Sequence, residues 1–136
     1  DFVLPRYVQA ALRNEPLFVY GDGSQTRTFC YVDDTVETCV KAHESNVFEN
    51  DVINVGSESE ITILELARMV IKLANSNSRI EFQPPLAEGD MTRRCPDTAK
   101  MRQLLDRPLV KLEDGIRRLI EHYGTPAAQA AVATAR

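Results

Sequence analysis

The order of the predicted elements most limits the fold of this chain. Short β-prone runs alternate with amphipathic helices, and no long strand–helix–strand series is present. The spacing of apolar residues predicts helices over residues 4–13, 32–45, 62–75 and 112–123, and a short helix that Asp97 caps and that ends near residue 105. Extended segments are expected at residues 17–20, 27–31, 52–55 and 79–82, and a loop at 84–96. In a chain of 136 residues, this order predicts a small mixed α/β unit rather than a complete doubly wound sheet.

Charge and composition exclude several classes of protein. The formal net charge is −4 and the pI is near 5.2, so bulk attraction to nucleic acid or to anionic membranes is not expected. No apolar stretch approaches the roughly 20 residues that cross a bilayer. Neither the cysteines nor the histidines have metal-ligand or redox spacing, so no metal is expected; they are Cys30, Cys39, Cys95, His43 and His122. With no signal peptide visible, the expected compartment is cytoplasmic.

The sequence Gly21-Asp22-Gly23-Ser24 predicts a tight turn, because glycine and aspartate tolerate the backbone angles of a reversal. This turn is expected to bring Tyr20 and Arg27 onto adjacent extended segments. An aromatic ring beside a guanidinium group can hold a base and clamp a phosphate. The alternative is a hairpin in which the arginine pairs with a surface carboxylate.

Motifs of self-sufficient catalysis and of cofactor binding are missing from the sequence. We find no G-x-G-x-x-G, no G-x-x-x-x-G-K-[ST] and no G-x-S-x-G. We therefore expect no catalytic, cofactor-binding or metal-binding residue in this chain.

Four blocks of sequence carry a resemblance to a known family. They are the block from Glu15-Pro16-Leu17 through Gln25-Thr26-Arg27 to Asp34, then Ile53-Asn54-Val55-Gly56, Thr62-Ile63-Leu64-Glu65-Leu66-Ala67, and the run from Asp90 to Lys100. Over residues 3–123 the chain resembles the extended short-chain dehydrogenase/reductase family of NAD-dependent nucleotide-sugar epimerases and dehydratases. UDP-glucuronate decarboxylases and dTDP-glucose 4,6-dehydratases are the most similar subfamilies, and UDP-glucose 4-epimerases are more distant.

The resemblance implies that the chain is the small mixed α/β C-terminal domain of such an enzyme, without the Rossmann domain. Residues 1–123 would bind the nucleotide sugar, and residues 124–136 would form an Ala-rich flexible tail. NAD and the catalytic Tyr-x-x-x-Lys pair would lie in the Rossmann domain, since no tyrosine of this chain has a lysine four positions later. The chain begins with Asp1, so we expect a fragment that is inactive alone, from a parent that forms a homodimer. The alternatives are a dehydratase or epimerase fragment, a non-enzymatic UDP-binding module, and a purely structural fragment whose nucleotide site does not form without the Rossmann domain.

The resemblance also implies which side chains bind a UDP- or dTDP-sugar. Arg27 matches the arginine that contacts the diphosphate, Tyr20 and Phe18 match the segment beside the base, and Gln25 belongs to the same block. Asn54 matches a position near the nucleotide, and Asp90 matches a position that faces the ribose. Epimerases and dehydratases usually carry a second phosphate-binding arginine where this chain has Ala87, and the decarboxylase-like pattern lacks that arginine as this chain does. Arg93 is the expected substitute, with Arg94 as the alternative.

Overall fold

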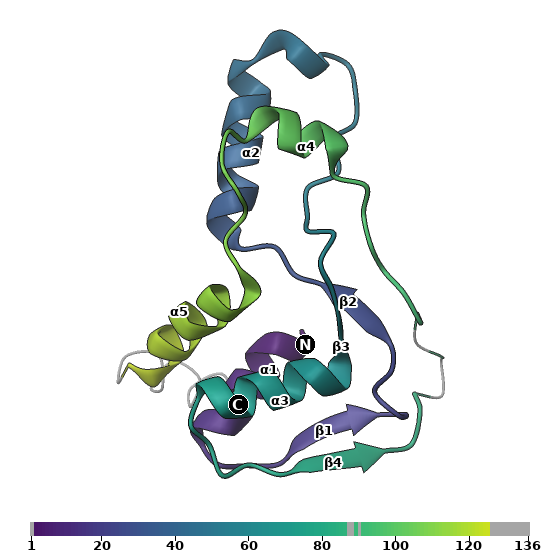
Figure 1. Cartoon of the computed structure of the whole chain (residues 1–136), viewed down its shortest axis with the longest axis vertical. Helices are drawn as coiled ribbons and strands as arrows, with labels where there is room; N and C mark the ends of the chain where they lie inside the picture. Colours follow the sequence, from purple (N-terminus) through teal and green to yellow (C-terminus); the bar gives the residue numbers. More distant parts are fainter. Residues whose placement is uncertain (1, 87–88, 90, 126–136) are drawn as a thin grey trace.

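The computed structural model describes residues 2–86, 89 and 91–125, which form helices and two small sheets, with β1 and β4 at one edge of the molecule (Figure 1). In chain order the elements are α1 (Val3–Leu12), β1 (Leu17–Tyr20), β2 (Thr26–Thr28), α2 (Val32–Glu44), η1 (Asn46–Phe48), β3 (Glu60–Thr62), α3 (Ile63–Leu73), β4 (Ile80–Gln83), α4 (Ala99–Leu104) and α5 (Leu112–Gly124). The predicted small mixed α/β architecture is therefore confirmed.

Each sheet consists of two strands that lie far apart in the sequence. β1 pairs in parallel with β4, with Leu17 opposite Ile80 and Tyr20 opposite Gln83. β2 pairs antiparallel with β3, with Arg27 opposite Ile61. The turn between β1 and β2 thus connects two separate sheets and does not close a hairpin.

The main core lies where α1, α3 and α5 pack against one another and against β1. Its fully buried side chains come from all four elements and include Tyr7, Val8, Leu17, Leu66, Val70 and Ile116. The predicted capping box opens α3, since Thr62 accepts a hydrogen bond from the Glu65 backbone and the Glu65 carboxylate accepts one from the Thr62 backbone.

A second part, formed by α2, η1 and α4, lies at the end of the molecule away from β1 and β4 (Figure 1). Its buried residues include Thr38, Met101 and Leu104. Valines on α2 remain exposed, among them Val32, Val36 and Val40. Within the described residues no helix is long and apolar enough to cross a membrane.

Most predicted helices begin and end within two residues of their expected positions. For α4 the prediction is displaced by one residue, because Thr98 occupies the N-cap position and the Asp97 carboxylate accepts a hydrogen bond from the Ala99 backbone at 2.9 Å. The Ala-rich segment falls almost entirely outside the described residues.

The predicted strand at residues 52–55 is wrong. The segment forms no strand, and Val52 is 76% exposed. A β-strand needs a neighbouring strand to accept and donate its backbone hydrogen bonds. No described strand pairs with this segment. Its backbone uses side chains instead: the Val52 carbonyl accepts a hydrogen bond from Lys100 at 3.0 Å, and the Val52 amide donates to Asp51 at 2.7 Å.

Candidate functional site

The turn after β1 is fixed both by its own hydrogen bonds and by packing. The Asp22 carboxylate accepts hydrogen bonds from the backbone and hydroxyl of Ser24, at 2.9 and 2.6 Å, and these bonds lower the pKa of Asp22. Gly23 has a φ of +75°, and a Cβ at this position would lie 2.8 Å from Val19 Cγ1. The Gly23 carbonyl also accepts a hydrogen bond from the Leu64 backbone at 3.1 Å. The turn is therefore anchored to the first turn of α3.

A pocket of about 540 Å³ opens beside this turn, and we call it the arginine pocket. Three predicted site residues line it together: Tyr20, Gln25 and Arg27. Arg6 from α1 and Arg94 from the loop before α4 line it as well, with the aromatic residues Phe2, Tyr7 and Phe29. Its described lining residues include no carboxylate. Three guanidinium groups beside aromatic rings favour an anionic ligand that carries a planar group.

Main-chain contacts hold this constellation in place. One guanidinium nitrogen of Arg27 donates to the carbonyls of Thr26 and Met91, each at 2.7 Å. The Thr26 backbone donates to the Thr92 carbonyl at 2.9 Å, so the loop that carries Arg94 runs beside β2. The Gln25 side chain donates to the Tyr20 carbonyl at 3.1 Å and fixes the end of β1.

A second hollow, of about 350 Å³, adjoins the arginine pocket and shares Tyr20, Gln25 and Leu86 with it. Pro85, Gly89, Thr92 and the turn residues, including the carboxylate-bearing Asp22, complete its wall. This hollow offers apolar surface next to the guanidinium groups, which suits a ligand with a phosphate at one end and a ring at the other.

The other predicted site residues lie outside the arginine pocket. Phe18 is 40% exposed on β1, and its carbonyl accepts a hydrogen bond from the Tyr7 hydroxyl at 2.9 Å. Asn54 donates to the Asp97 carbonyl at 3.2 Å. Asp90 falls outside the described residues.

Arg93, the expected substitute for the second phosphate-binding arginine, is engaged elsewhere. It forms a bidentate ion pair with Glu60, with nitrogen–oxygen distances of 2.8 to 3.1 Å. The alternative, Arg94, lines the pocket. Sequence reasoning missed Arg6 altogether. The sequence did contain one indication of its role. Arg6 is a cation in the first turn of α1, and this turn has no acidic residue. A cation is unfavourable there, because the N-terminus is the positive end of the helix dipole.

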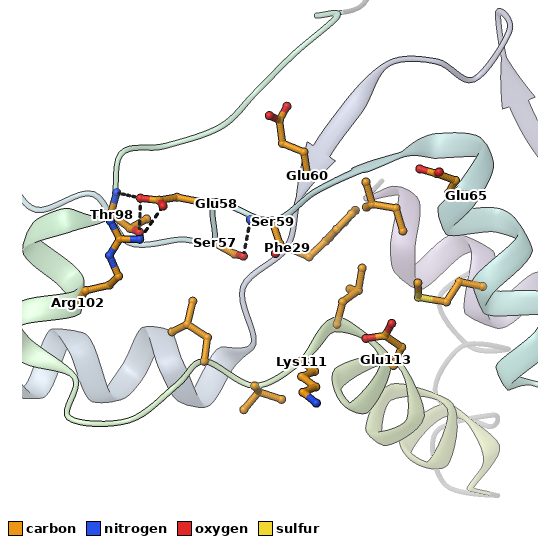
Figure 2. Close-up of a pocket in the computed structure, with 15 residues that line it drawn as sticks. Phe29, Ser57, Glu58, Ser59, Glu60, Glu65, Thr98, Arg102, Lys111 and Glu113 are labelled. Atoms are coloured by element: carbon orange, nitrogen blue, oxygen red, sulfur yellow. Dashed lines mark hydrogen bonds and ion pairs between the residues drawn. The ribbon is translucent and has the colours of Figure 1, made fainter.

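The larger pocket in Figure 2, of about 830 Å³, has the opposite electrostatic character. Four carboxylates line it, from Glu58, Glu60, Glu65 and Glu113, against two cations, Arg102 and Lys111. Hydrogen bonds from Thr98 and then from Arg102 lower the pKa of Glu58, so this group stays ionised at neutral pH. Such a lining disfavours a phosphate ligand, and the arginine pocket is the better candidate site.

Comparison with known proteins identifies the family to which this chain is similar. Residues 2–56 match the NAD dependent epimerase/dehydratase family. The chain is 37% identical over 127 residues to UDP-N-acetyl-alpha-D-glucosaminuronate decarboxylase of Bacillus cytotoxicus, covering 89% of this chain and 39% of that protein. It is 41% identical over 122 residues to UDP-glucuronic acid decarboxylase 1 of Danio rerio, covering 89% of this chain and 28% of that protein.

Solved structures agree with these sequence matches. UDP-glucose 4-epimerase of Thermotoga maritima, solved with UDP-glucose, superposes with a TM-score of 0.82 and 27% identity over 90% of this chain and 39% of the epimerase. UDP-glucuronic acid 4-epimerase of Bacillus cereus, solved with UDP-glucuronic acid and NAD, gives a TM-score of 0.78 and 30% identity over 89% of this chain and 39% of the epimerase.

The chain spans 28–39% of the length of these two curated relatives. Its sequence, its fold and the family match agree with one another. The chain is a relative of the NAD-dependent epimerase/dehydratase family and corresponds to part of such a protein.

Proposed function

We propose that this chain is the nucleotide-sugar-binding portion of an NAD-dependent UDP-sugar decarboxylase. Residues 1–123 form the binding domain. The remainder of the enzyme, including its NAD site and its catalytic pair, lies outside this chain, and the chain alone is inactive.

The observation that carries the proposal is the arginine pocket. Tyr20, Gln25 and Arg27 converge there with two further guanidinium groups, Arg6 and Arg94. A nucleoside diphosphate carries its negative charge on two phosphates and presents a flat base at one end. Charge-assisted hydrogen bonds from arginine suit the phosphates, and the adjoining hollow has room for the ring.

The described residues do not suit NAD itself. Dinucleotide sites use a glycine-rich turn between a parallel strand and a helix N-terminus. Here the glycine-containing turn after β1 leads into β2. We therefore assign no cofactor contact to this chain, and the NAD reported with the Bacillus cereus epimerase would bind elsewhere in the parent enzyme.

The uronic acid sugars named for the relatives favour decarboxylation. Both curated relatives cited above are decarboxylases of UDP-linked uronic acids. A second candidate is 4-epimerisation, because the Bacillus cereus structure pairs a similar fold with UDP-glucuronic acid. The choice between these reactions depends on the catalytic residues of the parent.

Calorimetric titration of the chain with UDP and dTDP tests the binding function. Arg27→Gln is expected to weaken UDP binding by about tenfold or more, because it removes a charge-assisted contact. Arg79→Gln is the matched control, since Arg79 carries the same charge outside the arginine pocket. Circular dichroism of each variant checks the fold. If wild type and Arg27→Gln bind UDP equally, or if neither binds it at millimolar concentration, the proposed binding function is wrong.

A further inference from the structure

Arg6 and Arg94 differ from most other arginines of the chain. Within the part that the structure describes, neither forms an ion pair or a side-chain hydrogen bond. Five other arginines each pair with a carboxylate: Arg13, Arg93, Arg102, Arg107 and Arg118. Two cations without a carboxylate partner therefore face the same pocket as Arg27.

Arg6 is held toward the pocket by an aromatic contact. Its guanidinium carbon lies 5.8 Å from the centroid of the Tyr20 ring, within the range of a cation–π interaction. The next residue, Tyr7, donates its hydroxyl to the Phe18 carbonyl at 2.9 Å and so ties α1 to β1. Because Tyr20 ends the same strand, this tie maintains the position of Arg6 over the ring.

The position of Arg6 in α1 also favours a bound anion. Arg6 lies in the first turn of α1, where the helix dipole is positive and where acidic side chains are usually stabilising. α1 has no acidic residue there. A bound anion would relieve the repulsion between the guanidinium and the helix terminus.

We propose that Arg6, supported by the ring of Tyr20, is the second phosphate-binding cation of the arginine pocket. The inference rests on the proposed function and extends it to one residue pair. This second cation comes from α1 and not from the loop that precedes α4, which carries Arg93 and Arg94.

Tyr20 then supports Arg6 in addition to lining the pocket. The guanidinium of Arg6 covers one face of the ring, so the ring acts as a platform for a phosphate-binding group. On this reading, Tyr20 contributes to affinity even for a ligand without a base. A tyrosine that only stacked on the base would contribute nothing to such a ligand.

A double-mutant cycle with two ligands separates these roles. UDP and inorganic pyrophosphate are titrated against wild type, Arg6→Gln, Tyr20→Leu and the double variant, with Arg79→Gln as the control for charge. Arg6→Gln is expected to weaken both ligands by about tenfold, since one charge-assisted contact is lost in each. Tyr20→Leu is expected to weaken both ligands as well, and the double variant little more than Arg6→Gln alone.

The outcomes are distinguishable. If wild type binds UDP and Arg6→Gln binds it equally well, the inference is wrong and the proposed function stands. If Tyr20→Leu weakens UDP but not pyrophosphate, and its effect adds to that of Arg6→Gln, Tyr20 is a base-stacking residue and the platform is wrong. If wild type binds neither ligand, the proposed function fails and the inference fails with it.

Discussion

The guanidinium of Arg107 donates a hydrogen bond to the carboxylate of Asp34 at 2.6 Å, although the two residues are 73 positions apart. Asp34 is fully buried, and its second oxygen accepts a hydrogen bond from the Val110 backbone at 2.9 Å. Arg107 also pairs with Glu37 one turn further along α2. This cluster holds the segment before α5 against the N-terminal turns of α2, and thereby joins the two parts of the molecule.

We expect Asp34→Ala to lower the free energy of unfolding by about 2–3 kcal/mol, because it leaves the Val110 backbone amide without its acceptor and removes one of the two carboxylates that hold Arg107. Glu37→Gln removes a carboxylate from the same arginine at a more exposed position, and a smaller loss is expected. Urea unfolding followed by circular dichroism measures both. Equal losses in the two variants would show that the buried carboxylate has no special role.

The two glycines of the turn after β1 should respond differently to alanine. Both have positive φ, +68° at Gly21 and +75° at Gly23, so each substitution carries a backbone penalty of about 1–2 kcal/mol. A Cβ at Gly21 would meet nothing closer than 4.0 Å, whereas one at Gly23 would lie 2.8 Å from Val19 and 3.0 Å from Leu64. We therefore expect Gly23→Ala to cost about 3 kcal/mol or more. Chemical denaturation that gives the two variants the same stability would contradict this packing.

Tyr7 should make stability fall at alkaline pH. Burial raises the pKa of Tyr7 from 10.0 to about 12. Between these values the unfolded chain loses the phenolic proton while the folded chain retains it, so the folded state loses stability as pH rises. Below pH 10 the neutral hydroxyl donates to the Phe18 carbonyl, and Tyr7→Phe is expected to cost about 1 kcal/mol.

Thermal unfolding of wild type and Tyr7→Phe at several pH values tests this prediction. The difference between the two proteins should shrink as pH rises from 10 and then reverse in sign before pH 12, because raising the pKa from 10.0 to about 12 corresponds to more free energy than the hydrogen bond contributes. The other tyrosines are common to both proteins and cancel in the comparison. A difference that stays constant over this range would mean that Tyr7 titrates alike in the folded and unfolded states.

The exposed valines of α2 should cause the chain to self-associate. Val36 and Val40 lie one helical turn apart and are 55% and 47% exposed. Exposed apolar patches favour association, so light scattering is expected to show oligomers whose proportion rises with concentration. Substituting lysine at both positions should reduce them.

Phe82→Lys is the matched control for this experiment, because Phe82 is 57% exposed on β4, away from α2 (Figure 1). Oligomers that persist in the α2 variant but disappear in the control would place the association surface on β4. A monomer at every concentration of wild type would contradict the prediction altogether.

Local sequence patterns predicted the helices well. The capping box of Thr62 and Glu65 begins α3 where expected, since both partners of each hydrogen bond lie within three residues. The turn at residues 21–24 also follows from its own composition. Features of this kind depend on neighbours in the chain, and the sequence displays those neighbours directly.

Whether residues 52–55 form a strand could not be predicted from local sequence. Its residues favour extended structure, but a strand forms only beside a partner, and no described strand pairs with it. Similarly, Tyr20 and Arg27 lie close in sequence yet belong to different sheets, because β1 pairs with β4 and β2 pairs with β3.

The sequence by itself determined the helix boundaries, the glycine turn and the family resemblance centred on Gln25 and Arg27. Only the tertiary structure decided which cations accompany Arg27. Arg93, expected in the site, pairs with Glu60, whereas Arg6 and Arg94 line the pocket from two distant segments. The physical reason is that membership of a pocket depends on long-range strand pairing and helix packing, which bring together side chains that no local pattern connects.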